Sequence, residues 1–173
     1  MNAKKRMIYA IKVLLDKYPI QKITTDMIVK ESDLSKTTFY RYFQDKYMLM
    51  KEYYFYVVDN ILSKKGTTFE EIYINLMEFI KANKEYFTEL TKQPGQENFI
   101  TTFYESSYFH ANRIMENNKK EPLTSDEQLQ LSLFIYGCAH LTEEWIKSNF
   151  KETPQSIVTT IRKCVPNELD TYL

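Results

Sequence analysis

Apolar residues recur at helical spacing through most of the 173-residue chain. Near the N-terminus, residues 4–18 place apolar side chains three or four positions apart, so this segment is predicted to form an amphipathic helix. Tyr18-Pro19 should end it, because the residue before a proline disfavours the helical conformation. The apolar positions of this helix are Met7, Ile11, Leu14, Leu15 and Tyr18.

Three more helices are predicted before residue 63. Thr24 or Thr25 can cap the segment DMIVKES, Ser35 can cap residues 36–43, and Asp45 can cap residues 46–62. The break between the second and third of these helices is about three residues long. Short helices joined by such a tight turn are typical of a helix-turn-helix unit.

The helix predicted over residues 36–43 mixes aromatic, hydroxyl and basic side chains. Phe39 and Phe43 lie four positions apart and can face a core. The other side chains then lie near the N-terminal end, which a recognition helix places in the major groove of DNA. Lysine and arginine can donate to guanine, and threonine and tyrosine hydroxyls can bond phosphate. A solvated helix with all its aromatic residues in the core is the alternative.

The remaining residues are also predicted to be helical. Capping-box spacing occurs at Thr67–Glu70 and Thr68–Glu71, and again at Thr124–Glu127 and Ser125–Gln128. The later helices are expected at residues 85–91, at 97–116, at 126–149 and from Pro154 onward. The predicted fold class is all-α, with an N-terminal three-helix helix-turn-helix domain, residues 1–48, and a C-terminal helical bundle, residues 49–173.

Composition and charge agree with this class. Three glycines and five prolines are too few for the many tight turns of an all-β fold. The formal net charge is zero, but residues 1–50 hold ten basic and five acidic side chains, a net charge of +5 that the other residues balance. A basic head on an acidic body is expected when one end of a protein meets phosphate. Ordinary charge scatter is the alternative.

Several other classes of protein find no support in the sequence. Cys138 and Cys164 form no CxxC pair, and neither histidine lies at metal-ligand spacing with them, so no disulfide scaffold and no metal site is expected. No GxSxG, P-loop, GxGxxG or HExxH pattern occurs, so neither an enzyme activity nor a cofactor is predicted. The N-terminal apolar run is broken by Lys12, and no segment reaches the length of a membrane span, so we expect a cytoplasmic protein without membrane contact.

Residues 8–49 resemble the DNA-binding domain of the TetR/AcrR family of bacterial transcriptional regulators. The resemblance rests on ITTDMIV at the second predicted helix, LSKTTFYRYF at the turn and third helix, and DKYML at the fourth. Family members usually have glycine where this chain has Asp33, and many have glycine at the position of Thr37. Aspartate tolerates the left-handed turn conformation better than most residues, so we expect the turn to be kept.

The resemblance also implies which residues meet double-stranded DNA. The DNA-contact positions of the family correspond here to Thr25, Lys36, Thr37, Thr38, Tyr40 and Lys46. Arg41 and Tyr42 lie where family members vary and where sequence preference can be set. Asp26, near the start of the second helix, either repels phosphate or serves as an acid in the first helical turn.

The helix predicted at 126–149 is apolar on two sides, so it must be buried on two sides. One side can meet the chain's own core and the other a second subunit; a central helix of a monomeric bundle is the alternative. The resemblance favours a homodimer, because TetR-like proteins pair through their last two long helices, and a two-fold dimer needs a roughly palindromic DNA site. The residues expected at the dimer interface are Phe134, Gly137, Cys138, Leu141 and Trp145.

A small-molecule effector pocket is a further hypothesis for the C-terminal domain. An apolar stripe with polar tips runs along residues 97–116, and ligand pockets combine apolar walls with a few such groups. Plain core packing is the alternative. The residues considered for the pocket are Phe103, Tyr104, Ser107, His110, Tyr136 and His140.

The sequence therefore predicts a dimeric TetR-like regulator that binds a palindromic operator through residues 36–43 and responds to an effector. The alternative is a TetR-like co-regulator with weak intrinsic DNA binding that acts through a protein partner. Residues 136–161 are similar to a TetR subgroup that includes regulators of dihydroxyacetone-kinase operons. Some members of that subgroup are activators that work with a protein partner, so the sign of regulation stays open.

Overall fold

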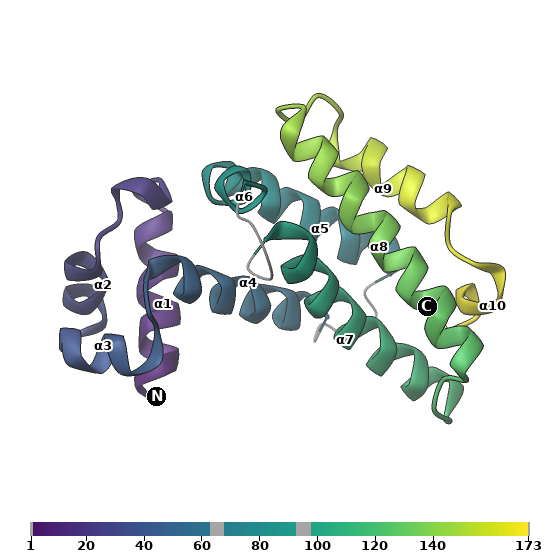
Figure 1. Ribbon diagram of the computed structural model, residues 1–173, viewed down its shortest axis with the longest axis horizontal. Coiled ribbons are helices and arrows are strands. Elements are labelled where there is room, and N and C mark those ends of the chain that lie inside the picture. The colour runs from purple at the N-terminus through teal and green to yellow at the C-terminus, as the bar shows by residue number, and fades with distance from the viewer. Residues whose placement is uncertain (1, 63–67, 93–97, 173) are drawn as a thin grey trace. The chain divides into compact units, whose positions relative to one another are not determined.

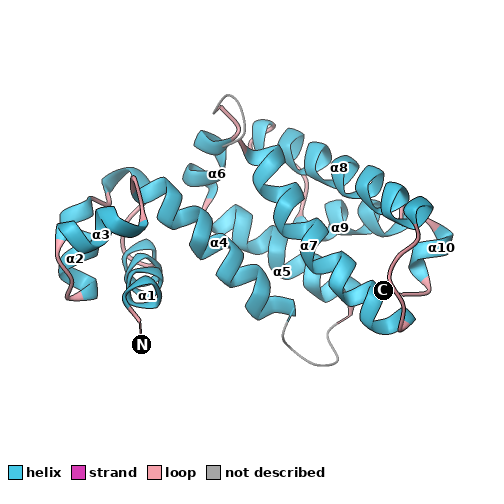
Figure 2. Ribbon diagram, turned by 60° about the horizontal axis from the view of Figure 1, so that its bottom comes forward, coloured by secondary structure: helices cyan, strands magenta, loops and turns pink. Residues whose placement is uncertain are grey.

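The computed structural model describes residues 2–62, 68–92 and 98–172, and every regular element in these ranges is helical (Figures 1 and 2). The first elements are α1 (Ala3–Leu15), the 3₁₀ turn η1 (Ile20–Lys22), α2 (Thr25–Ser32), α3 (Lys36–Tyr42) and α4 (Lys46–Leu62). They are followed by α5 (Phe69–Ala82), α6 (Lys84–Leu90), α7 (Phe99–Lys119), α8 (Ser125–Lys147), α9 (Pro154–Lys163) and α10 (Asn167–Asp170). The predicted all-α class is confirmed.

The chain divides into two compact units, Met1–Val58 and Asp59–Leu173, and the division falls within α4. Each unit has its own group of buried apolar side chains. The functional division expected after residue 48 stays a prediction, because compactness alone does not show which residues carry a function.

In the N-terminal unit, α1, α2 and α3 pack against one another around a common core. Asn2 caps α1, since its Oδ1 accepts a hydrogen bond from the Lys5 amide at 2.9 Å. α1 ends at Leu15 and not at the predicted Tyr18, whose amide still bonds the Leu14 carbonyl in a terminal turn. The fully buried side chains of this core include Met7, Ile11, Ile20, Ile23, Ile28 and Phe39.

In the C-terminal unit, α7 packs along α8 and α5 along α9, while α6 and α10 contact α8 (Figure 1). Aromatic rings join α5, α6 and α7: Phe87 lies 6.0 Å from Phe79 and 6.1 Å from Phe99 between ring centroids, and Phe99 lies 5.6 Å from Phe103. Edge-to-face and tilted pairs at these separations are favourable. This aromatic row holds the N-terminal half of α7 in the core.

Three helices of the C-terminal unit, α5, α8 and α9, begin at caps that the sequence predicted. The structure forms capping boxes between Thr68 and Glu71 and between Thr124 and Glu127. The alternative cap at Thr67 lies outside the described residues. Thr153 caps α9, with a proline at the first helical position as predicted.

Candidate nucleic-acid interface

The turn between α2 and α3 contains Asp33, Leu34 and Ser35, as predicted. Asp33 adopts the left-handed conformation, with φ 51° and ψ 52°. Aspartate is one of the few residues with a side chain that visit this region readily. Arg6 of α1 donates to the Asp33 carbonyl at 2.9 Å and to its carboxylate at 3.0 Å. Arg6 therefore holds the turn at Asp33, the residue that stands where the resemblance would lead us to expect a glycine.

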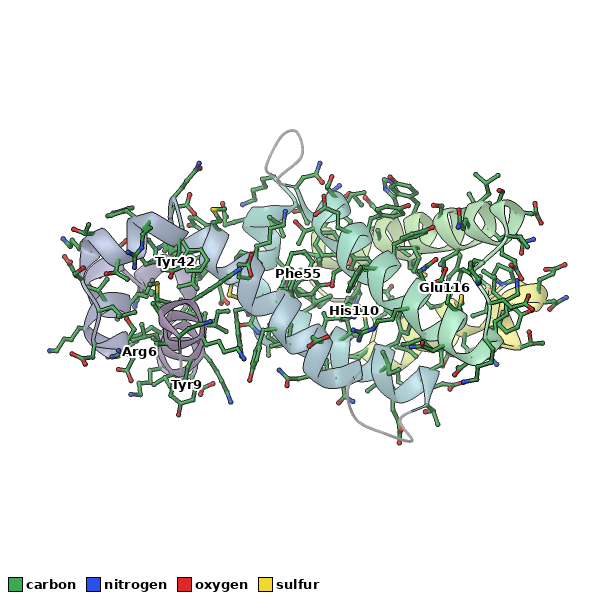
Figure 3. The ribbon with its side chains drawn as sticks, turned by 90° about the horizontal axis from the view of Figure 1, so that it is seen from below. Arg6, Tyr9, Tyr42, Phe55, His110 and Glu116 are labelled. Carbon is green, nitrogen blue, oxygen red and sulfur yellow. The ribbon has the colours of Figure 1, made fainter. Side chains whose placement is uncertain are left out.

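α3 divides its side chains between core and surface. Ser35 begins the helix, since its Oγ accepts from the Thr38 amide at 3.1 Å. Phe39 and Phe43 are buried, with 0% and 2% of their surface exposed. The exposed side of α3 consists of Lys36, Thr37, Tyr40, Arg41 and Tyr42, the last of which is labelled in Figure 3. The core and surface faces expected for a recognition helix are both present.

Lys36 forms an ion pair with Asp26 on this surface. Its Nζ lies 2.7 Å from Asp26 Oδ1, and the two side chains are 58% and 70% exposed. The hydrogen bond to Asp26 and the charge of that carboxylate raise the pKa of Lys36. The sequence left open whether Asp26 repels phosphate or only serves the first turn of α2. The structure shows that it neutralises a lysine expected to contact DNA.

Lys46 lies in a different environment from Lys36. Its ammonium donates to the carbonyls of Ile20 at 2.8 Å, Gln21 at 3.1 Å and Ile23 at 2.8 Å. These bonds use all three ammonium protons, and burial lowers the pKa of Lys46. Lys46 therefore ties the first turn of α4 to η1 and the chain before α2. A DNA contact of Lys46 stays a prediction and would require one of these bonds to open.

The two remaining positions that are expected to contact DNA are threonines. Thr25 is the first residue of α2 and half-exposed, and the cap itself is Thr24, whose Oγ1 accepts from the Met27 amide at 3.3 Å. Thr38 is half-buried, and its hydroxyl lies 3.0 Å from Ser35 Oγ. Sequence reasoning missed the pairing of Arg6 with Asp33 and of Asp26 with Lys36, since neither pair has a helical spacing along the chain.

The residues considered for an effector pocket separate into different environments. Tyr104 stacks on Tyr108 and Tyr136, with ring centroids 5.4 Å and 4.1 Å away, and its hydroxyl lies 2.7 Å from Ser132 Oγ. Phe103 is buried in the aromatic row of α7. Ser107 is half-exposed, whereas His140 is exposed on α8.

His110 is buried in the C-terminal unit (Figure 3). Burial, and next the charge of Arg113, lower its pKa below the ordinary value of 6.5, against an opposing effect of Asp59. The imidazole is therefore neutral at pH 7. Its Nδ1 lies 4.0 Å from Asp59 Oδ1, beyond hydrogen-bonding distance.

Three of the residues expected at a dimer interface are largely buried within one chain. Trp145 is 2% exposed, and its Nε1 donates to the Glu152 carbonyl at 2.9 Å. Cys138 is 4% exposed, and burial raises the pKa of its thiol to about 12. Phe134 is 9% exposed. These side chains have little surface left for a partner, so Trp145 in particular belongs to the subunit's own core.

The outer face of α8 nevertheless presents apolar side chains to solvent. Leu129 is 69% exposed, Leu133 77% and Tyr136 44%. A β-carbon added at Gly137 would meet open space. A groove of about 610 Å³ lies between α8 and α9, and its lining includes Leu133, Phe134, Gly137, Leu141, Ile161 and Cys164. Gly137 and Leu141 thus line an open groove, and their place in a dimer interface stays a prediction.

These features define a helical protein with an N-terminal helix-turn-helix unit. Family models match two parts of the chain: residues 8–53 match the bacterial regulatory proteins of the tetR family, and residues 67–167 match a transcriptional regulator C-terminal region. The second match alone covers more than half of the chain. The chain therefore belongs to the TetR family of bacterial transcriptional regulators, as the resemblance predicted.

Two solved structures share the fold along almost the whole chain. The dihydroxyacetone kinase operon activator DhaS matches with a TM-score of 0.64 at 15% identity, over 98% of this chain and 97% of that chain. The TetR family repressor AlkX from Dietzia sp. strain DQ12-45-1b, implicated in biodegradation of n-alkanes, matches with a TM-score of 0.60 at 15% identity, over the same shares of both chains. No curated protein sequence matches. Among the described residues, no helix is long and apolar enough to cross a membrane.

Proposed function

We propose that this protein is a homodimeric transcriptional regulator that binds a palindromic operator through α3 and is controlled by a small-molecule effector in its C-terminal unit. The observation that carries the proposal is the exposed side of α3. It presents basic and hydroxyl side chains, while Phe39 and Phe43 fix the helix from the inside. These side chains match guanine and phosphate, and the helix has the length and position of a recognition helix.

The homodimer rests on the exposed apolar face of α8. Leu129 and Leu133 are more than two-thirds exposed, and the groove beside them is lined mainly by apolar residues. A contiguous apolar surface of this kind favours a partner, and a second copy of the chain can supply the same surface in return. Two-fold pairing places two α3 helices against two half-sites, about 34–36 Å apart for successive turns of DNA.

Effector control requires that a ligand bind one conformation of the dimer better than another. The interior of the C-terminal unit offers buried polar groups that suit a ligand, among them His110. DhaS is called an activator and AlkX a repressor, so the sign of regulation forms no part of this proposal. The proposal includes no catalytic step, since the family is one of transcriptional regulators.

The test is selection of DNA by the purified full chain from a randomised duplex library at several salt concentrations. We expect an enriched palindrome whose affinity falls steeply as salt rises, because each phosphate contact releases counterions. Lys36→Ala or Tyr40→Ala should weaken binding of the selected site by about tenfold or more and leave the dimer intact. Lys81→Ala, which changes an exposed lysine of the C-terminal unit, is the matched control and should bind as the parent does.

Two results would contradict the assignment. Binding of the selected site by both α3 variants at parental affinity would show that α3 is not the recognition helix. Absence of any enrichment at low salt would favour the co-regulator that acts through a protein partner. Pull-down of that partner would then be the next experiment.

A further inference from the structure

The deeply buried side of α7 carries a line of polar atoms. Thr102 and Ser106 are each 1% exposed and His110 is 6% exposed. They follow one another at intervals of four residues, so they lie on one side of the helix on three successive turns, about 6 Å apart along its axis. An amphipathic helix normally places apolar side chains in this position.

These polar atoms have no hydrogen-bond partner among the residues that the structure describes. The atoms concerned are Thr102 Oγ1, Ser106 Oγ and His110 Nδ1. Two other hydroxyls of the same unit are bonded: Thr142 Oγ1 donates to the Cys138 carbonyl at 2.8 Å, and the Tyr104 hydroxyl lies 2.7 Å from Ser132 Oγ. Because buried polar groups almost always have partners, three orphaned atoms on one line call for a missing partner.

The line faces away from the aromatic stack that joins α7 to α8. Tyr104 and Tyr108 form that stack together with Tyr136 of α8. Phe99 and Phe103 lie beside the line instead. The ring of Phe99 contacts Phe87 of α6 and also the ring of Phe103. Thr102, Ser106 and His110 therefore belong to the interior of the C-terminal unit, with aromatic walls next to them.

The electrostatic surroundings select the charge of the partner. Burial lowers the pKa of His110, so its imidazole is neutral. The hydroxyls of Thr102 and Ser106 also carry no charge. Asp59 and Arg113 pair with each other, Nη2 to Oδ1 at 3.6 Å, and are 56% and 50% exposed. Their charges oppose each other near His110, so a buried ion would lack a counter-charge.

We propose that Thr102, Ser106 and His110 bind the polar groups of a neutral, polyhydroxylated small molecule such as a short polyol. Hydroxyls both donate and accept, so a chain of them can match two protein hydroxyls and a neutral imidazole on successive helical turns. This inference rests on the proposed effector control and names its ligand class. Of the residues that the sequence suggested for an effector pocket, the proposed site contains only His110.

The experiment follows thermal unfolding of the full-length protein with glycerol, erythritol or xylitol, at concentrations below those where polyols stabilise proteins in general. Glycerate is the charged counterpart. The test variant is the double substitution Thr102→Val and Ser106→Ala, which removes two orphaned hydroxyls while keeping nearly the same shape. Ser132→Ala is the matched control, since it removes a bonded hydroxyl from the Tyr104 stack on the other side of α7.

We expect at least one neutral polyol to raise the unfolding temperature of the parent in a saturable way, as specific binding requires. The double variant should fold at least as stably without ligand and lose this response, while Ser132→Ala keeps it. No saturable response in the parent, an equal response to glycerate, or an unchanged response in the double variant would each overturn the proposal. DNA selection is measured separately, so such a failure leaves the regulator assignment standing.

Discussion

At the scale of single residues, acidic side chains form ion pairs with basic residues of the N-terminal unit. Asp33 engages Arg6 at the turn, and Asp26 engages Lys36 at the start of α3. An exposed ion pair of this kind adds little to folding stability. Its larger effect is expected on binding, because in the proposed DNA complex Lys36 would exchange Asp26 for DNA and the carboxylate would lie close to the phosphates.

Asp26→Asn is therefore expected to tighten DNA binding several-fold, and more for random DNA than for the selected site, since it frees a charge without adding base recognition. The thermal stability should stay nearly unchanged. The measurement is a salt titration of binding to specific and random duplexes. Glu31→Gln, an exposed acid on the same helix, is the control for loss of negative charge. Equal effects of the two substitutions would show that the pair with Lys36 has no special role.

At the scale of helices, one carboxylate, that of Glu127, supports the start of α8. Glu127 Oε2 accepts from Lys119 Nζ at 2.6 Å, from the Thr124 amide at 2.7 Å and from the Thr124 hydroxyl at 2.9 Å. The bond from Lys119 and then the bond from the Thr124 amide lower the pKa of Glu127 to about 2. One carboxylate thereby caps α8 and joins it to the end of α7.

This arrangement predicts a pH-dependent effect of Glu127→Gln. The folded pKa is depressed, so the unfolded chain takes up the proton first as pH falls, and the stabilisation is lost between about 4.5 and 2. Glu127→Gln should be less stable than the parent at pH 7, and the difference should shrink across that window. Urea unfolding at a series of pH values measures it. Glu78→Gln, an exposed acid on α5, should show no such convergence, and a constant deficit in Glu127→Gln would exclude the charge effect.

At the scale of the whole molecule, the exposed and buried parts of α8 have different roles. Trp145 supports its own subunit through its bond to Glu152 and the ring of Phe150, 4.8 Å away. A charge introduced at Trp145 would unfold the chain before it tested any dimer. Leu133 is exposed on the same helix, so a substitution there can test the proposed dimer without loss of the core.

Leu133→Glu is expected to convert the proposed dimer to a monomer, because it places a charge in an apolar interface that the partner cannot pair. Affinity for a palindrome should fall with it, since two half-sites would no longer be bound together. Sedimentation at micromolar concentration is the measurement. Phe109→Glu, an equivalent change at a 62% exposed residue of α7 that does not line the groove, should remain dimeric. A parent that sediments as a monomer would remove the dimer proposal.

The sequence predicted the elements well because their signals are local. The apolar spacing of α1, the caps at Ser35, Thr124 and Thr153, and the burial of Phe39 and Phe43 each depend on residues within a few positions of one another. Asp33 could be placed in the left-handed turn for the same reason, since few other residues with side chains accept that conformation. The TetR family followed from the motifs built on these elements, and the family models confirm it.

What the tertiary structure alone decided is which side chain meets which across the chain. Asp26 forms an ion pair with Lys36, and the ammonium of Lys46 donates to three carbonyls before α2. The spacing of these residues along the chain predicts neither contact. The two apolar sides of α8 were predicted, but only packing shows that Trp145 is used within the subunit and Leu133 is left exposed. The polar line on α7 likewise gives no distinctive signal in the sequence. Whether a buried hydroxyl has a hydrogen-bond partner depends on which residues the fold places beside it.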